Sequence, residues 1–282
     1  MSLRIRVVAG VAAVAAVALA AAGLAAGPAD ASRSGPAPDH GRRPGLESVV
    51  PVNLSHLNDP AVTPVFPGDP PFELETVATV EEDGFYQQYV REAEHTGTHW
   101  GAPCHFQAGG RCADDLDPAD LYLPAVRIDV RALVRGNADY EVTVADLTRW
   151  ERRYGRIPPE SAIILQTGWE RRWGTPAYPN TDAGGVIHQP GFSIEAAQWL
   201  VDTGRLGRRG ALGTDTFSPD AGTNEDFSVS TLLYDQRRIS LENLANLDRL
   251  PPRGAWVLVG GPINKDGSGS TATIYGLVPR GR

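Results

Sequence analysis

The stretch His95-Thr-Gly-Thr-His99-Trp-Gly-Ala-Pro-Cys-His105-Phe106 holds three of the chain's six histidines within eleven residues. His95 and His99 are four residues apart, so they project from one side of a helical turn or converge from a loop that Gly97 allows to bend tightly. Neutral imidazole is a good ligand for zinc or manganese. A single histidine is usually structural, whereas a cluster this dense indicates a metal site or an acid–base site.

The composition indicates one globular domain that acts on a small molecule. The chain has 282 residues, of which 41% are hydrophobic and 21% charged, and no internal linker rich in Pro, Gly or Ser divides it. Such a chain can bury one substantial core. The formal net charge of −8 and the lack of a long Lys/Arg run argue against nucleic acid or an anionic membrane as partner.

Residues 1–31 resemble an export signal. Arg4 and Arg6 give a positive start, residues 7–26 are almost wholly apolar, and Ala29-Asp-Ala31 is a small-x-small cleavage site. A membrane anchor is the alternative, because the apolar run is long enough to span a bilayer. The run is rich in Ala and Gly and the cleavage site follows at once, so we predict cleavage after Ala31 and a secreted, extracytoplasmic protein.

Cys104 and Cys112 are the only cysteines. In an oxidising exterior, a pair eight residues apart can close a small loop, and a disulfide there would hold the segment that carries His105. A free buried thiol at Cys104, or a role for Cys104 as a metal ligand, are the alternatives.

Hydrophobic periodicity predicts alternating strands and helices after a disordered linker at residues 32–48, within a domain at 49–282. Helices are expected at 143–154, capped by Thr143, and at 193–200, capped by Ser193. Trp169 follows a predicted strand at its carboxyl end, where open α/β folds build sites. Strands are expected near 49–56, at 74–80, 85–90 and 122–134, within 162–169, and at 210–213, 254–259 and 271–278.

The histidine stretch resembles the signature of the cyclase family, which includes bacterial kynurenine formamidase and isatin hydrolase, written His-x-Gly-Thr-His-x-Asp-x-Pro-x-His. The segments PGFSIEAAQWL, LGTDTFSPD, ISLENLANLDRLPP and GSGS are also similar to the family, so the resemblance covers nearly all of residues 49–280. It implies an α/β architecture, the swivelling β/β/α fold with mixed sheets and flanking helices. It also implies a homodimer or homotetramer.

The resemblance implies a metal centre built from the histidine stretch and a later glutamate. His95 and His99 correspond to metal ligands, and His105 to a ligand or to the general base near metal-bound water. Glu242 occupies the position of the late glutamate, as a ligand and catalytic residue. Read without the family, Glu242 is an ordinary charge beside a helix start. The implied cofactor is Zn²⁺ or Mn²⁺.

Two positions depart from the family pattern. Gly101 stands where the family has a metal-binding aspartate, and Ser230 stands where it has a late histidine. A catalytic zinc site needs three protein ligands and a water, so His95, His99 and Glu242 could still form a mononuclear site, but a binuclear site is not expected. Residues that could substitute as ligands are Asp215, Asp220, His188 and Cys104.

The function that the resemblance implies is hydrolysis of an amide bond in a small aryl-formamide or cyclic amide. Metal-activated water would attack the carbonyl, and His105 would pass a proton to the leaving amine. Residues expected to line the substrate pocket are Trp100, Phe106, Trp169 and His188. The alternative is a catalytically degenerate member of the family that binds a small molecule without metal. His56 is expected either as a structural residue or at the rim of the pocket.

Overall fold

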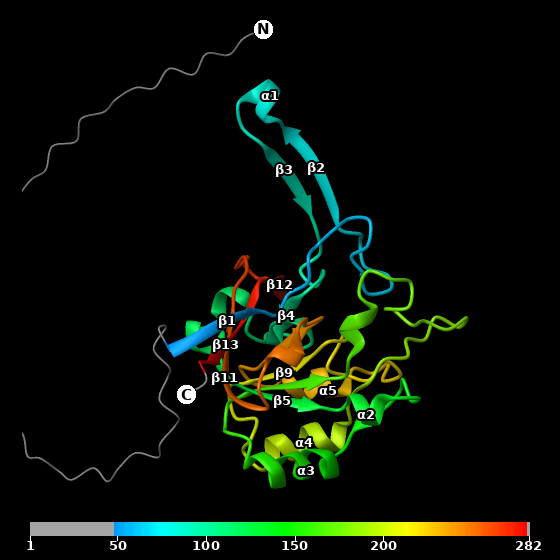
Figure 1. The fold of residues 1–282 in the computed structure, drawn as a ribbon, viewed down its shortest axis with the longest axis vertical. Coiled ribbons are helices and arrows are strands. Elements are labelled where there is room, and N and C mark those ends of the chain that lie inside the picture. Colours follow the sequence, from blue (N-terminus) through cyan, green and yellow to red (C-terminus); the bar gives the residue numbers. More distant parts are fainter. Residues whose placement is uncertain (1–47, 281–282) are drawn as a thin grey trace, which may run out of the picture. The chain divides into compact units, whose positions relative to one another are not determined.

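The computed structural model describes residues 48–280, in which the main feature is one nine-stranded mixed sheet (Figure 1). The export signal predicted at residues 1–31 and almost all of the linker predicted at 32–48 lie outside the described residues. Within residues 48–280, no helix is long and apolar enough to cross a membrane. The strands, in sheet order, are β1 (Val49–Asn53), β13 (Ile274–Pro279), β11 (Arg253–Val259), β5 (Tyr122–Asp129), β7 (Ala162–Gln166), β9 (Ala211–Thr214), β10 (Ile239–Glu242), β4 (His99–Gly101) and β12 (Gly269–Thr271).

The centre of the sheet is parallel and covered on both faces. Strands β5, β7, β9 and β10 run parallel, while the strands outside them are paired antiparallel. All five residues of β7 are buried. Ile163 and Leu165 belong to one apolar core, and Ala162 and Ile164 to a second core on the opposite face. This alternation explains why the strand reads as a continuous apolar run in the sequence.

The first core is closed by the helices α3 (Val144–Tyr154), α4 (Ile194–Asp202) and α5 (Ser228–Leu233), and Figure 1 shows α3 and α4 side by side. The predicted caps are confirmed. The Thr143 side chain accepts a hydrogen bond from the backbone N–H of Asp146, and Ser193 accepts one from Ala196. Both caps satisfy backbone groups that the first helical turn leaves without partners.

The expectation of one strand across residues 122–134 was wrong. Strand β5 ends at Asp129, and α2 (Arg131–Val134) follows it. The Asp129 carboxylate accepts hydrogen bonds from the backbone N–H and the Nε of Arg131, which turns the chain at this point. An apolar run does not by itself distinguish a strand from a buried helical turn.

Strands β2 (Glu73–Ala78) and β3 (Gln87–Arg91) form a separate two-stranded sheet, joined through α1 (Val80–Asp83) (Figure 1). Every residue of β3 is exposed. Six large apolar side chains on this hairpin are between 50% and 58% exposed: Val77, Val80, Phe85, Tyr86, Tyr89 and Val90. A hairpin without further partners is only marginally stable in water.

The remaining elements are short. Strand β6 (Glu141–Val142) pairs with β8 (Gly191–Phe192) in a second two-stranded sheet. Single 3₁₀ turns occur at η2 (Pro103–His105), η3 (Ala113–Asp115), η4 (Pro118–Asp120), η5 (Trp169–Arg172) and η6 (Leu247–Arg249). Of these, η2 matters most for the site because it carries His105.

Candidate active site

The site is organised by the pairing of β4 with β10. In this antiparallel register His99 lies opposite Glu242, Trp100 opposite Leu241, and Gly101 opposite Ser240. Successive side chains of a strand point to opposite faces of the sheet. His99, Gly101, Ser240 and Glu242 therefore share one face, whereas Trp100 and Leu241 point into the second core.

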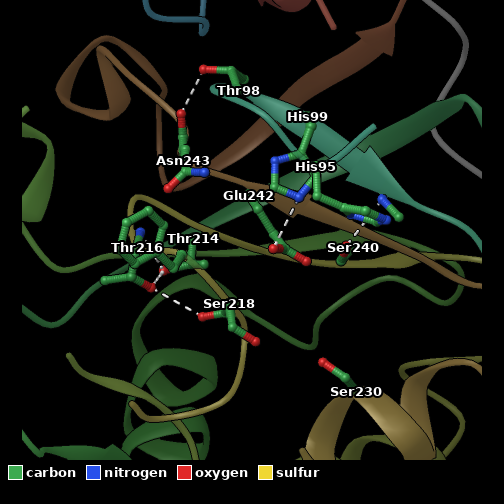
Figure 2. A network of polar contacts seen from close by, with 12 residues as sticks. His95, Thr98, His99, Thr214, Thr216, Ser218, Ser230, Ser240, Glu242 and Asn243 are labelled. Carbon is green, nitrogen blue, oxygen red and sulfur yellow. Dashed lines mark hydrogen bonds and ion pairs between the residues drawn. The ribbon is translucent and has the colours of Figure 1, made fainter. Parts of the chain in front are cut away.

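His99 and Glu242 form a buried ion pair across the two strands (Figure 2). Nε2 of His99 lies 3.1 Å from Oε2 of Glu242, although the N–H is not well aligned with the carboxylate. Nδ1 lies 3.0 Å from the carbonyl oxygen of Gly97 and donates to it. Burial alone would lower the pKa of His99, but the nearby charge of Glu242 outweighs it, and the net pKa is raised. Glu242 therefore favours the protonated form of His99.

His95 is held neutral. Its Nε2 lies 3.0 Å from Oγ of Ser268, which donates in turn to Oε2 of Glu94 at 2.8 Å. Because the Ser268 hydrogen goes to Glu94, Nε2 of His95 is the donor to Ser268. Burial, followed by the proximity of His99 and His105, lowers the pKa of His95 to about 2.

His105 lies in the 3₁₀ turn η2, and its ring stacks on that of His95 with centroids 3.9 Å apart. The structure joins Cys104 to Cys112 by a disulfide, with Cα atoms 5.1 Å apart, so the residue next to His105 is covalently anchored. Burial is the main cause that lowers the pKa of His105 below its usual value. His105 is an exposed residue that lines the cavity, and its lowered pKa favours the unprotonated imidazole.

A cavity of about 270 Å³ opens beside these groups. Its size is near the lower limit of about 300 Å³ that is usual for ligand pockets, so it suits a small molecule. The polar lining consists of the three histidines, Glu242, Asp69, Ser218 and Ser230. The apolar lining consists of four aromatic rings: Phe66, Phe106, Phe217 and Phe227.

Gly101 has no room for a side chain. A Cβ atom at this position would lie 2.1 Å from the hydroxyl of Tyr234 and 2.8 Å from Oγ of Ser240. The Tyr234 hydroxyl donates to Oγ of Ser240 at 2.7 Å, and Ser240 also accepts from the backbone N–H of Gly101 at 3.1 Å. The place that a longer side chain at position 101 would take is filled by this hydrogen-bonded pair.

The side chain of Ser230 is hydrogen-bonded to the carboxylate of Asp220. Its Oγ donates to Oδ2 of Asp220 at 2.5 Å, and its backbone N–H donates to the same oxygen at 3.0 Å. Asp220 further accepts from the backbone N–H of Val229 and from the side chains of Asn224 and Ser218. The carboxylate is therefore saturated by donors rather than directed at the cavity.

The donors that the structure brings together do not fit the metal centre that the resemblance implies. Among residues 48–280, no group of three or more His, Cys, Asp or Glu side chains is arranged so that it could hold a metal ion. The Nδ1 bond of His99 to a backbone carbonyl is typical of a ligating histidine, but its Nε2 faces Glu242 in an ion pair. The carboxylate expected at position 101 is absent and its space is taken by Tyr234.

Three residues expected to contact substrate do not line the cavity, whereas Phe106 does. Trp100 points away from it because it alternates with His99 and Gly101, and it is 1% exposed. Trp169 is buried in the first core, where its Nε1 donates to the carbonyl oxygen of Tyr178 at 2.8 Å. His188 lies in an outer loop, where its ring pairs with Asp139 and Asp182.

His56 lies away from the cavity and stacks on Trp173 with ring centroids 3.9 Å apart. This supports the structural alternative. The substitute ligands considered for the site are likewise engaged elsewhere: Cys104 is in the disulfide, and the buried carboxylate of Asp215 accepts from the backbone N–H groups of Thr167 and Glu170.

Several residues that shape the site were not predicted from the sequence. Asn243 follows Glu242, and its Nδ2 donates to the same Gly97 carbonyl that accepts from His99, while its own carbonyl accepts from Thr98 (Figure 2). Its position next to Glu242 is the only local signal that could have pointed to it. Residues from distant segments that were also missed are Phe66, Asp69, Phe217, Phe227, Tyr234 and Ser268.

The sequence of the chain is similar to those of known proteins. The model of the Cyclase family, described as "Putative cyclase", matches residues 52–221. The chain is 30% identical to isatin hydrolase of Roseibium aggregatum over 220 residues, which cover 75% of this chain and 82% of that protein. It is 25% identical to kynurenine formamidase of Paracidovorax citrulli over 204 residues, which cover 72% of this chain and 85% of that protein.

A solved structure titled isatin hydrolase A from Labrenzia aggregata, bound to benzyl benzoate, is similar in fold, with a TM-score of 0.76 at 29% identity. The match covers 83% of this chain and 95% of that one. The fold expected from the resemblance is thereby confirmed. The matched family model, the relatives and the shared fold agree, and the chain belongs to the cyclase family.

Proposed function

We propose that this protein hydrolyses the amide bond of a small aromatic substrate, either a cyclic amide fused to an aromatic ring or an aryl-formamide. The observation that carries the proposal is the buried His99–Glu242 pair at a cavity lined by four phenylalanines. The relatives named isatin hydrolase and kynurenine formamidase support the same reaction class. Aromatic walls suit a flat ring, and the ionisable groups at one end suit its polar carbonyl and nitrogen.

The pKa values of His105 and His99 are shifted in opposite directions, and we assign their roles from this difference. Burial lowers the pKa of His105 and favours its neutral form, whereas Glu242 raises the pKa of His99 and favours its charged form. Environments that push two pKa values apart in this way separate a general base from a general acid. We assign His105 as the base and the His99–Glu242 pair as the acid.

The proposed reaction needs only water and substrate. His105 removes a proton from a water molecule whose oxygen attacks the carbonyl carbon of the amide. The C–N bond then breaks, and the imidazolium of His99 donates a proton to the leaving nitrogen. The products are a carboxylic acid and an amine, on one molecule for a cyclic amide and on two for a formamide. Glu242 stabilises the charge on His99 before the transfer.

The test is direct turnover of isatin and of formanilide by the purified full chain, followed by absorbance. We expect hydrolysis that is lost in His105→Ala and in Glu242→Gln. Gln keeps the size of Glu242 but removes its charge, so it separates electrostatics from packing. Equal rates in the wild type and in both variants would contradict the assigned roles.

A second candidate function is a binding protein that retains the cavity without turnover. Gly101 and Ser230, whose surroundings are occupied by Tyr234 and Asp220, favour it. Calorimetric titration with isatin distinguishes the two candidates. Saturable binding with no product after long incubation supports the binding protein, whereas product formation supports the hydrolase.

We also propose that the protein is exported and forms a homodimer or homotetramer. The disulfide between Cys104 and Cys112 supports export, since such bonds persist in oxidising compartments. The exposed apolar side chains of the β2–β3 hairpin support self-association, because a second copy would remove them from water. Light scattering of the protein purified after residue 31 tests the assembly.

A further inference from the structure

Position 101 is closed to every residue except glycine, for a steric reason. A Cβ atom placed there would lie 2.1 Å from the Tyr234 hydroxyl, far below a van der Waals contact. Backbone strain is not the cause, because the backbone at Gly101 is that of an ordinary β-strand paired with Ser240. The glycine and the tyrosine are therefore two parts of one arrangement.

Tyr234 is fixed in this place from several directions. Its hydroxyl donates to Ser240, and its ring is stacked against Phe106 with centroids 5.9 Å apart. It lies just after α5 and is 2% exposed. The Tyr234 hydroxyl therefore fills the space beside Gly101.

The exchange removes a negative charge from the pocket. In the family signature the residue at this position is an aspartate, which supplies an anionic oxygen to a divalent cation. A phenol that donates its hydrogen to a serine supplies no charge, and Glu242 is already paired with His99. A divalent cation needs anionic or neutral donors directed at one point, and the described residues do not provide them.

We infer that Tyr234 has replaced the anionic metal ligand and that this protein holds no resident divalent cation at the three-histidine site. The inference deepens the proposed function, on which it rests for the location of the active site. On this inference, His105, His99 and Glu242 carry out the proton transfers of the proposed reaction without a bound cation. The inference also predicts that restoring the aspartate alone is not sufficient, since the Tyr234 hydroxyl occupies the space that its side chain would need.

The experiment measures metal retention without substrate. The full chain is loaded in turn with zinc, manganese and cobalt, dialysed, and analysed for metal per chain. The informative variant is Gly101→Asp with Tyr234→Leu, which restores the carboxylate and clears its space. Its matched control is Gly101→Asn with Tyr234→Leu, which has nearly the same volume but no charge. Thermal melting checks that each variant is folded.

We expect the wild type to retain no stoichiometric metal, and the Asp/Leu variant to retain one ion per chain. Its affinity should exceed that of the Asn/Leu control by about 100-fold or more, since even supporting groups around a ligand are worth about 10- to 100-fold. Stoichiometric metal in the wild type, lost in His99→Ala, would overturn the inference. So would a folded Asp/Leu variant that binds no better than its control.

The wild-type measurement decides alone if the Asp/Leu variant does not fold. Retention of one ion then overturns the inference, and absence of retention supports it. Because metal content is measured without turnover, its outcome is separate from that of the proposed function. A protein that holds no metal and hydrolyses nothing would contradict the proposed function and leave this inference intact.

Discussion

The pairing of β4 with β10 brings together two contrasting sets of residues, one at each half of the site. In one half, His99 and Glu242 face each other across β4 and β10 as charged groups at the edge of a cavity. In the other half, two positions further along the strands, Gly101 faces Ser240 and the space between them is filled by Tyr234. The first half keeps groups that can exchange protons. In the second half, the hydroxyl groups of Tyr234 and Ser240 are hydrogen-bonded to each other beside Gly101.

The difference teaches that a glycine at a buried polar site need not leave a cavity, because a side chain from elsewhere in the chain can fill the space. Buried polar groups are stable only when they are hydrogen-bonded, and the Tyr234 hydroxyl and the backbone N–H of Gly101 both donate to the buried Ser240. Here the residue that fills the space comes from the end of a helix far along the chain. Tyr234 in this position requires glycine at 101, because any Cβ atom there would collide with its hydroxyl.

The largest effect is expected in the charged half. Replacing His105 by alanine removes the general base, and such groups typically contribute about 100- to 10,000-fold to the rate. We expect a loss of kcat in that range, measured on isatin and formanilide. His188→Ala is the matched control, since His188 is a histidine paired with carboxylates outside the cavity. A similar loss in both variants would show that the effect is not specific to the site.

In the closed half, Gly101→Ala should cost stability. The added methyl group would collide with a buried, hydrogen-bonded tyrosine, and overpacking of this kind typically costs about 1–3 kcal/mol. Denaturant unfolding measures the change. Gly207→Ala is the control, because its Cβ would meet only the flexible side chain of Glu160 at 3.1 Å. An unchanged unfolding free energy in Gly101→Ala would contradict the described packing of Tyr234.

The pH dependence of the rate should be bell-shaped. His105 must be neutral and its pKa is lowered, so activity rises with pH through a value below 6.5. His99 must be protonated and its pKa is raised, so activity falls through a value above 6.5. Each limb should change the rate about tenfold per pH unit. The charges that face these two rings are those of Glu242, Asp69 and Glu94.

The free energy of unfolding also depends on pH through the raised pKa of His99. Because its folded-state pKa is raised, the ion pair with Glu242 stabilises the fold below about pH 6.5, and this contribution is lost as the pH rises through the folded-state pKa. Glu242→Gln should remove that part of the pH dependence. An unchanged pH profile of unfolding in Glu242→Gln would show that the pair does not carry the shift.

The smallest effect is expected for Tyr234→Phe. The change removes one hydrogen bond to Ser240, which still accepts from the backbone of Gly101, so we expect a cost of about 0.5–1.5 kcal/mol. Retention of the ring should leave the cavity and the rate almost unchanged. A rate loss as large as that of His105→Ala would assign Tyr234 to the chemistry and remove the contrast between the two halves.

Local signals in the sequence were sufficient for part of the site. The three histidines lie within one short segment, and the helix caps at Thr143 and Ser193 are encoded within a single turn, so both were found. The expectation that Glu242 belongs to the site, as a metal ligand and catalytic residue, came from the family resemblance. The strand register places Glu242 opposite His99.

The remainder depended on tertiary packing. Strand β4 is only three residues long, so its alternation could not show that Trp100 points into the core while His99 faces the cavity. Trp169 was placed at a strand end by a correct strand prediction, but its indole is buried beneath the following turn. Tyr234 has no local signal at all, because its role exists only where α5 meets β4 and β10.

The most direct measurement is the hydrolysis of isatin by protein stripped with a chelator, assayed in metal-free buffer with and without added zinc or manganese. The acid–base assignment predicts turnover that survives stripping, is not raised by either ion, and is lost in His105→Ala. Turnover that disappears on stripping and returns with an added ion would contradict it.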